Sequence, residues 1–179
     1  MVSPTPHQLR FVDHLCKLGA RDSPDRAALA AMRRAARGRP GANAEIHRYV
    51  APWIPEDMRD REVEGYYLVA ALFATHPENR PTDSERPWRT NFGASFSELR
   101  SRGNDSAERR FVALLNSHRE DLPNHLRHAV SLLRTHGVAV DWAQLIQDLR
   151  YWDHPDRFVQ REWARSFWAP ARDPQPTAS

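Results

Sequence analysis

Apolar residues recur every three or four positions along most of this chain, in segments separated by glycine, proline or polar residues. This spacing is typical of helices that bury one face. We find no convincing strand pattern, in which apolar and polar residues would alternate. The pattern therefore predicts an all-α protein with helices over the segments 6–18, 24–37, 43–51, 55–74, 95–101, 105–119, 122–136, 142–152 and 155–168.

Capping residues and helix breakers set the expected ends of these helices. Ser23 is placed to cap the second helix, with Pro24 in its first turn, where the missing N–H costs nothing. Gly38 and Pro40 are expected to end that helix. Further helix starts are expected at Pro55, at Asp105 (a capping box with Glu108), at Asp121, at Asp141 and at Pro155.

A polar, proline-containing stretch, HPENRPTDSERPWRTN, covers residues 76–91 and divides the chain. It is longer than most connections in compact domains and is read as a loop or linker. We predict an N-terminal helical lobe at 1–90, which includes an arginine-rich helix and this linker, and a C-terminal antiparallel four-helix bundle at 91–169. The polar residues 170–179 are expected to form a disordered tail.

Composition indicates a folded protein of a reducing compartment. The chain has 179 residues, of which 40% are hydrophobic and 27% charged, and a single cysteine. One cysteine excludes an internal disulfide and fits the cytoplasm. No run of 18 apolar residues is present, and the N-terminus lacks the apolar core of a signal peptide. We therefore expect a cytoplasmic protein without a membrane partner.

Arginine is the most informative residue type, because 25 of the 26 basic residues are arginines although the net charge is only +3. In the second predicted helix, Arg33 and Arg37 fall on one stripe and Arg34 lies beside it, with no acidic residue after Asp25 to balance them. An anionic partner would relieve their repulsion. Two other readings remain open: arginines near a helix C-terminus can simply complement its dipole, and a GC-rich genome enriches arginine without selection for function.

The predicted C-terminal helices carry further basic stripes, with neutral residues in the gaps, while acidic residues cluster at 56–64 and at the helix caps. This separation favours binding to a phosphate backbone. The basic residues of these stripes are Arg109, Arg110 and Arg119, then Arg127 and Arg134, and then Arg157, Arg161 and Arg165.

No pattern supports catalysis, and we expect no catalytic residue, metal or cofactor. His125 and His128 have a helical spacing that a metal would accept, but no third ligand accompanies them on that helix, and no HExxH or CxxC motif occurs. His118 is followed by Glu120 and Asp121 and so resembles a general base with an orienting carboxylate, but no sequence motif identifies a nucleophile for it. Among the six tryptophans, Trp88 in ERPWRTN is the one expected to be exposed and able to stack on a base.

Several longer segments resemble the CasB family, the small subunit of the type I-E CRISPR Cascade complex. They are YVAPWIPE at 49–56, YYLVAALFATHP at 66–77, NFGASFSEL at 91–99 and nearly all of 107–168. The resemblance covers about residues 7–168, and the combination of ERRFxxLL, the HLR helix, VDW and a final W-D-x-P is specific. It implies an all-helical, non-catalytic protein.

The resemblance also implies the partners and the site. The partners are the backbone and large subunits of Cascade, a second copy of the chain, target DNA and the guide RNA–DNA hybrid. The implied function is antiviral defence, in which basic surface residues bind and stabilise target strands in the R-loop. The nucleic-acid-binding residues predicted from the stripes and the family motifs together are Arg33, Arg34, Arg109, Arg110, Arg119, Arg127, Arg134, Arg150 and Arg157.

Two other classes of protein remain open at this point. One is a helical protein–protein interaction adaptor without direct nucleic-acid contact, whose arginines meet acidic protein surfaces. The other is a histidine-based hydrolase or metalloenzyme. The salt dependence of DNA binding separates the first from a nucleic-acid binder, because each lost phosphate contact reduces the salt slope by about one. Metal content after chelation tests the second.

Overall fold

The computed structural model describes residues 2–169, apart from the side chain of Asp105. Within this range it is all-helical, as predicted, with a single isolated parallel bridge between Asn79 and Val140 and no strand. The α-helices are α1 (Pro6–Leu18), α2 (Arg26–Ala35), α3 (Ala44–Val50), α4 (Asp60–Thr75), α5 (Phe92–Ser101), α6 (Asp105–Leu115), α7 (Leu122–Thr135), α8 (Trp142–Arg150) and α9 (Phe158–Trp168), and the 3₁₀ turns are η1 (Ala51–Trp53) and η2 (Pro87–Arg89). None of these helices is long and apolar enough to cross a bilayer.

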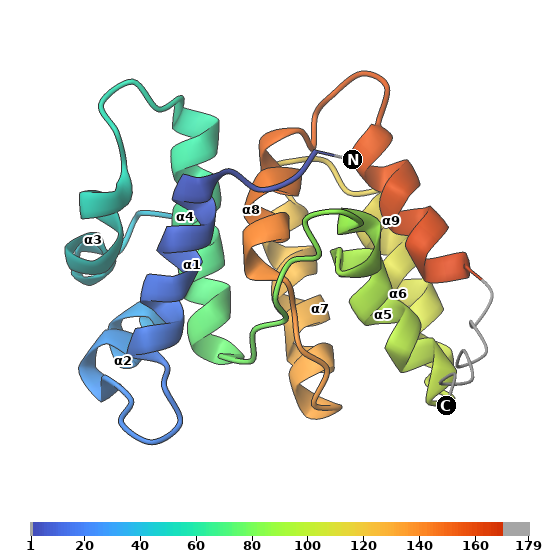
Figure 1. Cartoon of the computed structure of the whole chain (residues 1–179), viewed down its shortest axis with the longest axis horizontal. Coiled ribbons are helices and arrows are strands. Elements are labelled where there is room, and N and C mark those ends of the chain that lie inside the picture. The colour runs from blue at the N-terminus through green and yellow to red at the C-terminus, as the bar shows by residue number, and fades with distance from the viewer. Residues whose placement is uncertain (1, 170–179) are drawn as a thin grey trace, which may run out of the picture.

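The helices share one continuous hydrophobic core, and Figure 1 shows how they are arranged. The first four helices lie at one end of the molecule, α5, α6 and α9 lie at the other, and α7 and α8 lie between them. Helix α4 is buried along most of its length, as its nearly all-apolar sequence predicts, and packs against α2, α7 and α8. Helix α9 packs against α5, and α6 packs against α7 and α5.

The position of α8 differs from the arrangement expected from the sequence. Although it follows α7 in the chain, α8 packs mainly against α1 and α4 of the N-terminal segment. Its apolar stripe is buried, and so are its polar residues Gln144, Gln147 and Asp148. Gln147 accepts a hydrogen bond from Gln8 of α1 at 3.0 Å, which satisfies a polar group in this contact. A separate C-terminal four-helix bundle at 91–169 is thus not confirmed. The tail at 170–179 lies outside the described residues.

Several helix starts lie a few residues from their predicted positions. Helix α2 begins at Arg26, because Asp25, and not Ser23, accepts the capping hydrogen bond from the Ala28 amide at 2.9 Å. Pro55 and Pro155 lie in turns before α4 and α9 and do not begin them. Proline suits the second position of a turn as well as the first turn of a helix, so its presence alone does not locate a helix start. In α5 and α6 the caps are Asn91 and Asn104.

The predicted loop at 76–91 is packed against the protein. His76 is buried, and its Nε2 is 2.7 Å from the Val138 carbonyl. The Trp142 indole donates to the Glu78 carbonyl at 3.1 Å. The hydroxyls of Thr82 and Thr90 both donate to the carboxylate of Asp141 at 2.7 Å, and this carboxylate also caps α8 as predicted. The loop therefore fixes the start of α8.

Tryptophan exposure follows the prediction for Trp88, whose exposed fraction is 45%. Trp168, at the end of α9, is also exposed, at 41%. Trp142 and Trp163 are completely buried on the inward stripes of their helices.

Asp148 is a carboxylic acid enclosed between α8 and α9. It accepts hydrogen bonds from Trp163 Nε1 at 2.6 Å and from Gln144 Nε2 at 2.8 Å. Burial raises the pKa of Asp148 from 3.8 to about 7, although these two hydrogen bonds act in the opposite direction. The folded protein thus keeps this proton to a higher pH than the unfolded chain does.

This raised pKa predicts a specific pH dependence of stability. The contribution of Asp148 is full below pH 3.8 and is lost as the pH rises toward 7. Asn at this position cannot titrate, so the stability advantage of the wild type over Asp148→Asn should be smaller at pH 8 than at pH 4 by roughly 2–4 kcal/mol. Urea unfolding of both proteins at the two pH values measures this difference. An equal advantage at both would show that Asp148 does not titrate in this range.

Candidate nucleic-acid interface

Helix α2 presents its arginines because its apolar residues face the core. Leu29 and Met32 are buried, whereas Arg33 and Arg37 are exposed on the side toward α4 and α7. The Arg33 side chain crosses to the C-terminal end of α4, where its Nε donates to the Ala74 carbonyl at 2.6 Å. Terminal carbonyls of a helix lack intrahelical partners and carry partial negative charge, so they attract a guanidinium.

Helix α7 supplies the facing wall. Its buried stripe is formed by Leu126, Ala129, Val130 and Leu133. The stripe leaves Arg127, Ser131 and Arg134 on an outward face, as the sequence predicted, and the structure places this face toward α2. Arg134 Nη1 lies 3.4 Å from the carbonyl of Thr75 at the end of α4. Arg127 Nη2 donates to the Gly38 carbonyl in the loop after α2 and Nη1 to the side chain of Asn124.

Between these walls are two adjacent hollows that share Arg37 and Arg127. The smaller one, called the cup here, has a volume of about 340 Å³ and is lined by Arg33, Ala36, Arg37, Leu72, Thr75, Arg127, Ser131 and Arg134. The larger one, called the mixed hollow, has a volume of about 810 Å³ and is lined by Arg37, Gly38, Arg39, Pro40, Arg61, Glu64, Arg119, Glu120, Pro123, Asn124, Arg127 and Asp153. We refer to the two together as the arginine groove.

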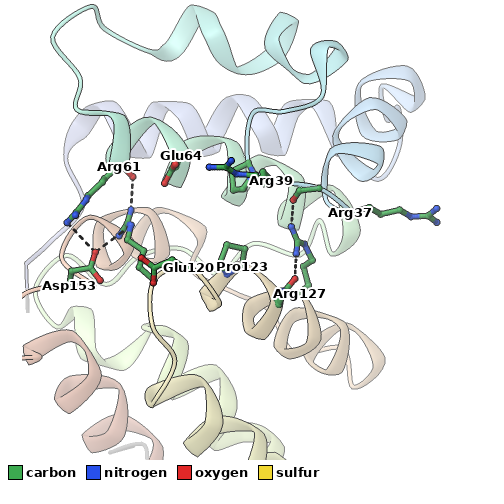
Figure 2. A pocket seen from close by; sticks show the side chains of 12 residues that line it. Arg37, Arg39, Arg61, Glu64, Glu120, Pro123, Arg127 and Asp153 are labelled. Carbon is green, nitrogen blue, oxygen red and sulfur yellow. Dashed lines mark hydrogen bonds and ion pairs between the residues drawn. The ribbon is translucent and has the colours of Figure 1, made fainter.

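The mixed hollow contains carboxylates that partly neutralise its arginines (Figure 2). Asp153 lies 3.4 Å from Arg61 Nη1 and 3.6 Å from Arg119 Nε. Arg119 also donates to two carbonyls, those of Leu149 at 2.7 Å and of Arg61 at 2.8 Å. Arg119 therefore joins α4 to the end of α8 and has a structural role at one end of the groove.

Orientation by carbonyls distinguishes the arginines around the cup. Arg33, Arg127 and Arg134 each donate to a backbone carbonyl, which has no formal charge, and none of the three forms an ion pair with a carboxylate of the described residues. The Arg37 side chain has no hydrogen-bond or ion-pair partner among the described residues. Burial lowers the pKa of Arg127, whose Nε is enclosed and unpaired. This part of the groove can bind an anion without first breaking an ion pair with a carboxylate.

The other arginines predicted from the sequence do not line the groove. Arg34 forms an ion pair with Glu45, and Arg150 forms one with Glu62 at 3.0 Å. Arg157 donates to the Leu115 carbonyl. Arg109 and Arg110 are exposed on α6. Within the described residues, the members of the predicted set that line the groove are Arg33, Arg119, Arg127 and Arg134.

The site list predicted from the sequence omitted Arg37, Arg39 and Arg61, which also line the groove. Arg37 could have been included, because it continues the Arg26–Arg33 stripe of the second helix. Arg39 follows the end of that helix, and Arg61 lies in an acidic segment, so helical spacing gave no signal for either of them. No group of three or more His, Cys, Asp or Glu side chains in the described range could hold a metal.

Comparison with known proteins establishes the family. The family profile described as CRISPR-associated protein Cse2 matches residues 28–168. A Cse2 protein of Thermus thermophilus is 36% identical over 160 residues, which cover 89% of this chain and 88% of that protein. The chain belongs to the Cse2 family. The CasB resemblance of the sequence is thus confirmed.

Solved structures of Cse2 and CasB proteins share this fold. The crystal structure of CasB from Thermus thermophilus superposes with a TM-score of 0.76 at 33% identity, covering 94% of this chain and 100% of that one. A chain of a CRISPR RNA-guided surveillance complex superposes with a TM-score of 0.74 at 30% identity, covering 90% and 91%. A Cse2-family fold therefore occurs within an assembled surveillance complex.

Proposed function

We propose that this Cse2-family chain is a non-catalytic, cytoplasmic subunit of a Cascade surveillance complex and that its arginine groove holds the phosphate backbone of a target-DNA strand in the R-loop. The presence of a relative in a CRISPR RNA-guided surveillance complex supports the assembly. The observation that carries the DNA role is the acid-free end of the groove, where arginines on α2 and α7 are oriented by backbone carbonyls.

The physical requirements of this role match what such a groove offers. Exchange of a DNA duplex for a guide RNA–DNA hybrid is nearly balanced in free energy, so a modest attraction for a separated strand can shift it. Contacts to phosphates carry no sequence information, which suits a complex that must accept every target that its guide specifies. Other Cascade subunits and a second copy of the chain are its proposed protein partners, and they would add to the affinity of a subunit with a net charge of only +3.

The salt dependence of DNA binding by the assembled complex tests this function. We expect Arg37→Ala with Arg134→Ala to reduce the slope of log affinity against log salt by about 1.4–1.8, because each lost phosphate contact reduces it by about 0.7–0.9. Arg109→Ala with Arg110→Ala removes the same charge from α6, outside the groove, and is the matched control. Equal slopes for the groove pair and the wild type would contradict the proposal and favour the adaptor role. A reduced salt slope in the control pair alone would indicate that α6, and not the groove, contacts the DNA.

A further inference from the structure

The cup differs in its charge from the mixed hollow beside it. Four arginines line it, and no carboxylate does. Figure 2 shows the Arg37 side chain extending away from Glu64, Glu120 and Asp153, which line the mixed hollow and not the cup. A ligand in the cup therefore meets no carboxylate, whereas an anion in the mixed hollow would meet three of them.

The arginines of the cup still have unused hydrogen-bond donors. Arg33 uses its Nε on the Ala74 carbonyl, and Arg134 uses Nη1 on the Thr75 carbonyl, so other N–H groups of each guanidinium remain available. The Arg37 guanidinium has no partner within residues 2–169 and retains all of its donors. Ser131 also lines the cup and can offer its hydroxyl, whereas the Thr75 hydroxyl already donates to the Leu72 carbonyl at 2.7 Å. Tetrahedral oxyanions need this arrangement of several N–H and O–H donors around a small volume.

The surroundings of the cup strengthen its electrostatic attraction. Leu72 and Ala36 are buried apolar residues in its lining, and apolar walls reduce the screening of nearby charges. Four like charges around one hollow also repel each other, and a bound anion relieves that repulsion. The cup is thus electrostatically incomplete without an anion.

We infer that the cup is a discrete phosphate-binding site. The phosphate could be a phosphodiester of a nucleic-acid strand or free inorganic phosphate, since both present the same tetrahedral oxygens. Binding of a nucleic-acid phosphodiester in the cup depends on the proposed function, whereas binding of free phosphate is independent of it. The mixed hollow is not part of this site, because its arginines Arg61 and Arg119 already face Asp153.

Calorimetric titration of the full-length chain with sodium phosphate, at an ionic strength held constant with sodium chloride, tests the site itself. We expect saturable binding by the wild type and a dissociation constant weakened about tenfold or more by Arg134→Ala, since a charge-assisted hydrogen bond contributes about 1.5–3 kcal/mol. Arg37→Ala should weaken it similarly, and it removes no intramolecular bond. Arg39→Ala alters only the mixed hollow and should leave the constant within about twofold. Absence of saturable binding by the wild type, or an equal effect of Arg39→Ala, would overturn the inference.

A second measurement identifies the source of the phosphate. Saturating inorganic phosphate is added to the assembled complex bound to target DNA, again at constant ionic strength. If the cup holds a phosphodiester, phosphate lowers DNA affinity in the wild-type complex and has no effect in the Arg37→Ala complex. If DNA affinity does not respond although the isolated chain binds phosphate, the cup binds free phosphate, and the proposed DNA contact at this end of the groove fails while the site remains.

Discussion

An alanine at position 93 is expected to destabilise the protein by about 3 kcal/mol or more. Gly93 lies at the start of α5, where this helix packs against α9. A Cβ atom built there would lie 2.1 Å from the carbonyl oxygen of Trp163 and 2.7 Å from its carbonyl carbon. These are backbone atoms in the middle of α9, so no side-chain rotation can relieve the overlap. The two helices must separate to accept Gly93→Ala.

Gly65→Ala is the matched control for this substitution. Gly65 is also buried and helical, but the Cβ built there meets only the Cβ of Leu149 at 3.8 Å, an ordinary contact. Alanine has a higher helix propensity than glycine, so we expect Gly65→Ala to leave stability unchanged or raise it by up to about 1 kcal/mol. Urea denaturation of both variants measures the difference, and comparable stabilities would show that α5 and α9 can shift apart freely.

Loss of the Arg119 side chain is expected to cost about 2–3 kcal/mol, or roughly 4–12 °C in Tm for a chain of this length. Only 16% of this side chain is exposed, and its guanidinium joins the Leu149 carbonyl to the Arg61 carbonyl. Arg119→Ala leaves both carbonyls without this donor and removes a cation beside Asp153. Thermal unfolding measures the change.

Arg61→Ala is the control, because Arg61 shares the contact with Asp153 but has a mostly exposed side chain. An exposed ion pair contributes at most about 1 kcal/mol, so this variant should unfold close to the wild type. A large decrease in Tm for Arg119→Ala, without one for Arg61→Ala, would show that the Arg119 side chain stabilises the fold. Equal effects would contradict its role as a link between α4 and α8.

The sequence allowed prediction of local structure more accurately than of packing. The bounds of α1 were predicted correctly from its helical apolar stripe, and the structure shows Thr5 and Gly19 capping its two ends. Asp121 and Asp141 directly precede α7 and α8, as predicted, but only the Asp141 side chain makes a capping hydrogen bond. The pairing of α8 with α1 and α4 could not be predicted, because an amphipathic stripe shows that a face is buried but not which helix covers it.

The same limit applies to the candidate site. Helical spacing correctly placed Arg127 and Arg134 on an outward face, but it could not show that this face lies opposite α2. Nor could it show which arginines are neutralised by carboxylates. Arg34 pairs with Glu45, which lies on another helix, and Arg150 pairs with Glu62, which is distant in sequence. The charge that remains available to a ligand depends on such tertiary pairs.

The packing of α8 against α1 and α4 also constrains the order of folding during synthesis. The N-terminal helices leave the ribosome well before residues 142–150 are made. Until then, the apolar side of α4 that α8 covers in the finished protein has no native partner and is open to chaperones or to other nascent chains. Native burial of that surface therefore waits for translation to pass beyond residue 150.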